Sequence, residues 1–140
     1  MAVEYLEHTA DLGLRATGAT LSEAFCEVAR GLFALMVDPT TVRPLTEHAV
    51  HLEAGSNDGL LVEWLSELLA QKELTGLVFS EFEARIGRSN GGRRLDGVAR
   101  GERLDPTQHR PGTEVKGISY LGLAVRQLDD GWSAQCVVDV

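Results

Sequence analysis

Two aspartates near opposite ends of the chain have the chemistry to bind a hard cation. Asp11 ends the polar segment Glu7-His8-Thr9-Ala10-Asp11 between two hydrophobic stretches, and functional residues often lie in such loops on rigid scaffolds. Asp139 precedes Val140, whose terminal carboxylate adds another anionic oxygen. These residues could supply the carboxylates for one Mg²⁺ or Ca²⁺ ion. One or two carboxylates bind such an ion weakly, so the site would need further oxygens from a partner.

Each aspartate also has a structural interpretation that needs no ligand. Asp11 can serve as a turn residue at the entry to a strand. Asp139 shares its strand face with Ser133 and Gln135, so that face can simply point to solvent. On a buried face the carboxylate would instead require a partner or a metal ion, because burying an unpaired charge is costly. The residues by themselves leave both interpretations open.

Lys116 is a third candidate, at the start of a long alternating stretch. A lone lysine in this position is usually a solvated side chain. Regular pairing of the last hairpin around Asp130 would set Asp139 opposite Leu121. Lys116 would then lie roughly 17 Å further along its strand. Spacing alone therefore places it away from Asp139, and only a bulge near Gly117 or a strong twist would bring the two together.

Other kinds of catalytic site lack their signatures in this sequence. There is no G-x-S-x-G elbow, Walker loop or dinucleotide-binding fingerprint. Zinc sites need clustered Cys or His, whereas the four histidines are dispersed: His8, His48, His51 and His109. His48 and His51 lie three apart in an expected strand, which puts them on opposite faces and at the surface. We therefore predict a protein with no catalytic reaction of its own.

Charge and cysteine usage indicate the setting in which the protein acts. The formal net charge is −8; residues 1–70 hold 11 acids and 3 bases, whereas residues 71–140 hold 10 of each. Bare RNA would repel such a protein, and its acidic half could dock on a basic, nucleic-acid-binding partner or merely maintain solubility. Cys26 and Cys136 lack CxxC spacing and are expected to be reduced, buried thiols. With no basic leader and no apolar run of roughly 18 residues, we expect a cytoplasmic protein without a membrane segment.

Two segments carry the periodicity of amphipathic helices. The first starts at a capping box formed by Thr20 and Glu23, and its apolar residues recur at helical spacing as far as Met36. The second follows a cap at Ser56 or Asn57 and carries an apolar stripe of leucines and one tryptophan. Both stripes predict helices that pack against a common core.

Period-two alternation predicts strands in most of the remaining chain. The expected strands cover residues 3–6, 12–18, 47–53, 77–87, 93–103, 115–128 and 132–140. Ser89-Asn90-Gly91-Gly92 is expected to form a hairpin turn, because Asn-Gly readily adopts positive φ. Strands interrupted by two helices indicate an α+β fold. We predict one compact domain over residues 1–140, an antiparallel-rich sheet with two main helices packed on one face.

The order of these segments resembles the archease family over essentially the whole chain. The first half carries EYLEHTADLGLRATG, LSEAFCEVARGLFALMVDPTTVRP and LLVEWLSELL. The second half carries GLVFSEFE, GERLDPTQHRPGTEVKGISYLGLAV and GWSAQCVVDV. The combination of EHTAD-G, LFALM-D, VK--(S/T)Y and a terminal DV is quite specific to that family.

The resemblance implies an accessory role in RNA ligation. Archeases assist the GTP- and metal-dependent RNA-splicing ligase that joins tRNA exon halves. They promote formation of the guanylate on the ligase histidine, support multiple turnover and broaden nucleotide use. Family positions linked to this activity correspond to Asp11, Lys116 and Asp139, of which the two aspartates resemble metal-binding carboxylates. RNA would be contacted only through the ligase, and His8 and His109 match family positions without a definite role.

The chain departs from the family pattern at one position, and two other functions are compatible with its sequence. Leu121 stands where many family members have a histidine, so a partner contact at this position would differ here. A chaperone-like modulator or binding module for RNA-modification proteins is the main alternative. A metal-dependent hydrolase of small phosphate compounds agrees less well with the small number of candidate bases.

Overall fold

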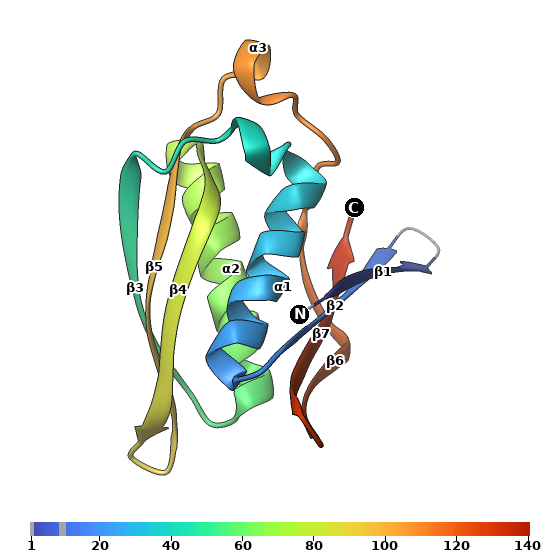
Figure 1. Cartoon of the computed structure of the whole chain (residues 1–140), viewed down its shortest axis with the longest axis vertical. Coiled ribbons are helices and arrows are strands. Elements are labelled where there is room, and N and C mark those ends of the chain that lie inside the picture. Colours follow the sequence, from blue (N-terminus) through green and yellow to red (C-terminus); the bar gives the residue numbers. More distant parts are fainter. Residues whose placement is uncertain (1, 9–10) are drawn as a thin grey trace.

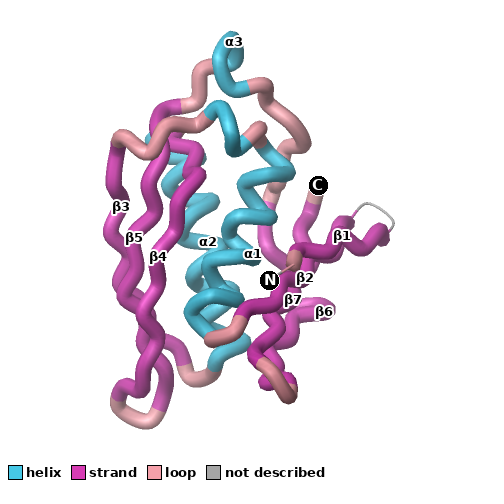
Figure 2. The backbone as a smooth tube through the Cα atoms, in the orientation of Figure 1, coloured by secondary structure: helices cyan, strands magenta, loops and turns pink. Residues whose placement is uncertain are grey.

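The chain folds into three layers, with two helices between two antiparallel sheets (Figure 1). The computed structural model describes residues 2–8 and 11–140, so Thr9 and Ala10 of the first polar loop lie outside the described residues. One sheet has the strand order β1-β2-β7-β6 and the other β3-β5-β4. The same layers can be followed along the backbone tube in Figure 2.

The elements follow one another closely in sequence. The strands are β1 (Val3–His8), β2 (Asp11–Gly18), β3 (Thr46–Ala54), β4 (Leu77–Ser89), β5 (Gly92–Arg103), β6 (Gly117–Leu128) and β7 (Gly131–Asp139). The helices are α1 (Leu21–Met36) and α2 (Asn57–Thr75), together with the short helices η1 (Pro39–Thr41) and α3 (Pro106–His109). The predicted single α+β domain with antiparallel strands and two main helices is therefore confirmed.

The strands expected in one sheet divide into two sheets, one on each side of the helix pair. Helix α1 packs against β2 and β4, and α2 packs against β3 and β6, so each helix contacts both sheets. Each helix buries more than one face, and a single sheet would cover only one of them. The second sheet therefore buries the apolar helix faces that a single sheet would leave exposed to solvent.

Both helices begin at the capping residues predicted for them. Thr20 Oγ1 accepts the Glu23 N–H at 3.1 Å, and the Glu23 carboxylate accepts the Ala19 N–H at 2.9 Å. Ser56 Oγ accepts the Gly59 N–H at 3.1 Å at the start of α2. Among the described residues, no helix has the length and apolar composition needed to cross a lipid bilayer.

The two helices are joined at the centre of the core by a buried tryptophan. Trp64 of α2 is fully buried, and its indole Nε1–H donates to the carbonyl oxygen of Phe25 in α1 at 3.1 Å. A buried indole N–H needs such an acceptor, so this bond fixes how the helices face each other. Between β4 and β5, Asn90 and Gly91 have φ values of 37° and 82°, so the predicted hairpin turn with positive φ is confirmed.

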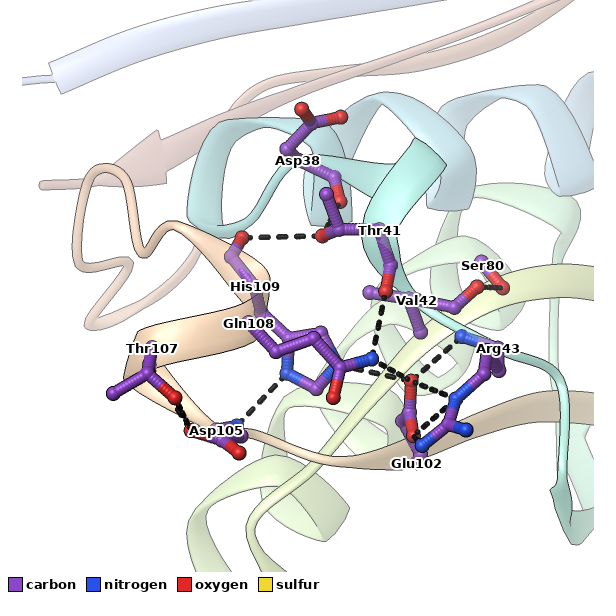
Figure 3. Close-up of polar contacts among 10 residues, drawn as sticks. All are labelled: Asp38, Thr41, Val42, Arg43, Ser80, Glu102, Asp105, Thr107, Gln108 and His109. Atoms are coloured by element: carbon purple, nitrogen blue, oxygen red, sulfur yellow. Dashed lines mark hydrogen bonds and ion pairs between the residues drawn. The ribbon is translucent and has the colours of Figure 1, made fainter.

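A buried histidine ties the loop after β5 to the segment before β3. His109 is fully buried, and its Nδ1 accepts the Asp105 N–H at 2.8 Å. The ring hydrogen is therefore on Nε2, which donates to Glu102 Oε2 at 2.9 Å (Figure 3). Glu102 also accepts from the Arg43 guanidinium at 2.9 Å and from the Arg43 backbone N–H at 2.8 Å. The bonds from Arg43, followed by the bond from His109, lower the pKa of Glu102 to about 2.

The connecting segment 110–116 then runs past the end of α1. The Gly112 N–H donates to the Met36 carbonyl and the Thr113 N–H to the Leu35 carbonyl, each at 2.8 Å. These are carbonyl groups that the helix end leaves without partners of its own. The segment consequently follows a fixed path from the buried histidine to the start of β6.

Glu102→Gln should change how stability depends on pH. The Glu102 pKa falls from 4.5 to about 2 on folding, so its ionised form stabilises the fold fully above pH 4.5, and this contribution is lost as the pH falls through about 2. We expect urea unfolding to give a lower free energy for the variant than for wild type at pH 7, with the gap narrowing between pH 4.5 and 2. Glu73→Gln, at an exposed position of α2, is the control and should show no such gap. A difference in the free energy of unfolding that stays constant from pH 4.5 to 2 would contradict the lowered pKa of Glu102.

Candidate functional site

The register of neighbouring strands brings the two candidate aspartates together. In the β2–β7 ladder Asp11 is the direct partner of Asp139, and in the β6–β7 ladder Asp139 is the partner of Gly117. In the β1–β2 ladder the backbone of His8 is the partner of Asp11. These four positions form one row across the sheet, which we call the carboxylate row. Residues from both ends of the sequence thus meet at one edge of the fold.

Within the carboxylate row, the two carboxylates share one face of the sheet. Direct antiparallel partners carry side chains on the same face, with Cβ atoms about 4.5–5.5 Å apart. Asp139 is exposed and Asp11 is half-buried, so burial does not force either side chain to have a partner. No ion pair within residues 2–8 and 11–140 neutralises either one. Like charges opposite each other destabilise a sheet, so the pair favours a cation between or beside them.

Lys116 lies beside Asp139, contrary to the expectation from regular pairing. Its backbone N–H donates to the Asp139 carbonyl oxygen at 2.8 Å. A bulge does bring Lys116 and Asp139 together, as the sequence allowed, but the irregularity begins after Ser119 rather than at Gly117. The Lys116 side chain is exposed, so its ammonium group is accessible at the same end of the sheet as the carboxylates.

A bulge in β6 produces this arrangement. From the hairpin end, β6 pairs regularly with β7 from Leu128 back to Ala124, and regular pairing resumes at Ser119. The four residues 120–123 therefore stand opposite Cys136 alone. The extra residues shift the remainder of β6 along β7, which sets Gly117 rather than Leu121 near Asp139. The sequence holds one signal of it: a glycine, Gly122, inside the alternating stretch, with φ of 76° in the structure.

Gly117 is the member of the row that the sequence did not single out as a site residue. An added Cβ at Gly117 would lie 3.7 Å from Asp139 Oδ2. The carboxylate of Asp139 therefore leans towards β6, over a position without a side chain. The missing side chain at Gly117 leaves room beside this carboxylate oxygen.

The row fits a hard cation only as an incomplete site. Asp11 and Asp139 offer carboxylate oxygens, and the partly exposed Val140, the third residue of the predicted metal set, follows Asp139 directly. In the part of the chain that the structure describes, no group of three or more Cys, His, Asp or Glu side chains has metal-binding geometry. Mg²⁺ and Ca²⁺ take six or more oxygen ligands, so water or a partner would have to supply the others.

The remaining histidines and the cysteines are engaged elsewhere. His48 Nε2 lies 2.7 Å from Glu67 Oε2 on the helix side of β3, and His51 Nδ1 lies 2.9 Å from Asp96 Oδ1 on the outer side. The predicted opposite faces are confirmed; His51 is exposed, whereas His48 is half-buried rather than at the surface. The side chain of His8 lies outside the described residues.

Both cysteines are free thiols, as predicted. Cys136 is buried and Cys26 is half-buried. Burial raises the pKa of the Cys26 thiol to about 11 and that of Cys136 to about 12. At neutral pH both are therefore protonated and poor nucleophiles, which is the behaviour of structural thiols.

Comparison with known proteins gives matches along the whole chain. The model of the archease protein family (MTH1598/TM1083) matches residues 3–140. Protein archease of Thermococcus gammatolerans is 44% identical over 138 residues, covering 98% of this chain and 97% of that protein. Protein archease of Methanopyrus kandleri is 38% identical over 140 residues, with both chains covered completely.

Two solved structures share the fold. The solution structure of Methanobacterium thermoautotrophicum protein 1598 superposes with a TM-score of 0.88 at 29% identity, covering 99% of this chain and 98% of the other. The crystal structure of an archease from Thermotoga maritima superposes with a TM-score of 0.61 at 19% identity, covering 96% and 94%. From the family model and the full-length relatives, we conclude that the chain belongs to the archease family.

Proposed function

We propose that this archease activates a GTP- and metal-dependent RNA-splicing ligase in tRNA splicing and RNA repair, and that it catalyses no reaction itself. Family membership supports the proposal, as does the placement of three residues that match activity-linked family positions. The observation that carries it is the direct pairing of Asp11 with Asp139, which puts two carboxylate side chains on the same face of the sheet. Lys116 is bonded to the same residue, Asp139.

The paired carboxylates suit a divalent cation, Ca²⁺ or Mg²⁺. Two unit negative charges about 5 Å apart repel each other by on the order of 1 kcal/mol in water, and a cation between them relieves that repulsion. When bound, the ion would supply positive charge to phosphate oxygens of the ligase nucleotide. Asp11 and Asp139 would hold its position, because the β2–β7 ladder fixes the separation of their backbones.

Lys116 adds a cationic group that the same sheet positions. Its Cα is fixed by the bond from its backbone N–H to the Asp139 carbonyl, while its exposed side chain extends freely. A lysine ammonium is a compact point charge that suits a phosphate or a carboxylate of the ligase. In the proposed mechanism, the row and Lys116 enter the ligase active site together and favour guanylylation and repeated turnover.

The charge of the chain is consistent with indirect contact to RNA. A net charge of −8 with acidic residues at the site disfavours binding to a phosphate backbone. The ligase would therefore contact the RNA, and this chain would contact the ligase. The proposed setting is the cytoplasm, where the free thiols of Cys26 and Cys136 stay reduced.

A chaperone-like modulator or binding module for RNA-modification proteins is the second candidate. The related Thermotoga maritima structure is described as that of a possible chaperone. Affinity purification of the tagged chain from its own cells separates the two functions. Recovery of one RNA ligase supports the activator, whereas recovery of many unrelated proteins supports the chaperone.

Asp139→Asn should reduce activation of the ligase. The substitution removes a charge but keeps the shape, so the strand register survives while a cation ligand is lost. We expect stimulation of multiple-turnover RNA ligation at saturating archease to fall about tenfold or more. Asp11→Asn should have a similar effect. Asp130→Asn, at the exposed hairpin turn, is the matched control, and equal stimulation by Asp139→Asn and wild type would reject the carboxylate mechanism.

Cation binding can be tested without the ligase. Titration of wild-type protein with Ca²⁺ or Mg²⁺ should shift the amide resonances of Lys116 and Gly117, which adjoin Asp139. The combined Asp11→Asn and Asp139→Asn variant should lose these shifts while its other resonances stay in place. Shifts that persist unchanged in this variant would place the cation elsewhere.

A further inference from the structure

The β6 bulge is a built feature of the sheet rather than a loose loop. Gly122 has φ of 76°, and a Cβ added to it would lie 2.9 Å from Val137 Cγ2, so the bulge packs tightly on β7. The Gln135 side-chain amide donates to the Gly122 carbonyl at 3.1 Å, and the Leu121 N–H donates to Ser119 Oγ at 3.0 Å. These contacts fix the backbone on both sides of the bulge tip.

The tip presents two large apolar side chains to solvent. Tyr120 is 70% exposed and Leu121 is 75% exposed, although both lie within a strand. Turn and loop tips usually carry small or polar residues, because these satisfy the backbone and tolerate water. Val137, beneath the bulge, is only 5% exposed, whereas Tyr120 and Leu121 keep most of their surface in solvent and so bury little of themselves within this chain. Adjacent exposed apolar residues on a rigid support are typical of an interaction site.

The apolar tip lies next to the carboxylate row. The pair Ser119–Val137, where regular pairing resumes, is two positions from the pair Gly117–Asp139, or about 7 Å at the usual strand rise. The same shift of register sets Gly117 opposite Asp139 and raises the tip. A partner surface that covers this end of β6 and β7 can therefore contact the row and the tip together.

We infer that Tyr120 and Leu121 dock this archease on the ligase, in an apolar depression beside the opening that receives the carboxylate row. The inference rests on the proposed function and assigns a separate task to a separate group of residues. The tip supplies affinity through apolar contact, and the row with Lys116 supplies activation.

Charge complementarity favours a basic protein surface as the occupant. Asp11 and Asp139 lie close to the tip and outnumber the neighbouring Lys116, so the cation-free surface is net negative and would repel the phosphates of a nucleic acid stacked on Tyr120. A second copy of the chain is also disfavoured. A symmetric contact places the same patch against itself, which would bring two carboxylate rows together. A basic rim around an apolar depression satisfies both parts of the surface.

The combined Tyr120→Ala and Leu121→Ser variant separates docking from activation. We expect the archease concentration for half-maximal ligase stimulation to rise about tenfold or more, while the maximal stimulation stays at the wild-type value. Asp139→Asn should do the opposite, lowering the maximum with little change in the half-maximal concentration. Leu74→Ser, at a 78% exposed leucine of α2, is the matched control and should change neither quantity.

Direct binding to the purified ligase, measured by calorimetry, distinguishes failure of the inference from failure of the proposed function. If the tip variant binds the ligase more weakly than wild type does, docking through the tip is supported. This conclusion holds even if wild type fails to stimulate the ligase, a result that would reject only the proposed activation. Unchanged half-maximal concentration and unchanged binding in the tip variant, with its β6 amide resonances retained, would overturn the docking assignment alone. RNA binding or self-association of the isolated protein that the tip variant abolishes would also overturn it.

Discussion

The hydrogen-bond register of β7 is the constraint on which the rest of the molecule depends. This strand pairs with β2 on one side and with β6 on the other. A slip of one residue would turn Ala134, Cys136 and Val138 away from the helices and move Asp139 to the inner face. Burial of these three side chains therefore also fixes the position of the exposed carboxylate. Core packing and site geometry are set by the same ladder.

Local periodicity was sufficient to predict the elements but not how they assemble. The capping residues Thr20 and Ser56 and the Asn90-Gly91 turn act within a few residues of themselves, so the sequence reports them directly. Alternation within a strand states which side chains share a face, yet it says nothing about which strand lies alongside. The division into two sheets depends on contacts between distant segments, which is why a single sheet was expected.

In the candidate site, too, contacts between distant segments cannot be predicted from local sequence patterns. Asp11 and Asp139 were identifiable by residue type, but their adjacency follows from a pairing between the two ends of the chain. Regular pairing predicts a position for Lys116 far from Asp139 because it ignores the bulge, whose sequence signal is Gly122. The burial of His109 cannot be predicted from the sequence. A buried imidazole needs hydrogen-bond partners, and only the folded chain brings Asp105 and Glu102 to its two ring nitrogens.

The bulge also makes β6 a strand of two independent halves. Residues 124–128 belong to the terminal hairpin and residues 117–119 pair with the end of β7 that carries Asp139, while residues 120–123 separate them. Side-chain changes at residues 120–123 leave the register of both halves in place, because the bulge residues take no part in the regular pairing with β7. Over evolution, this chain can therefore reshape its exposed tip to follow changes in a partner surface without disturbing the charged row. The same segment is a suitable place to attach a probe that reports on the partner.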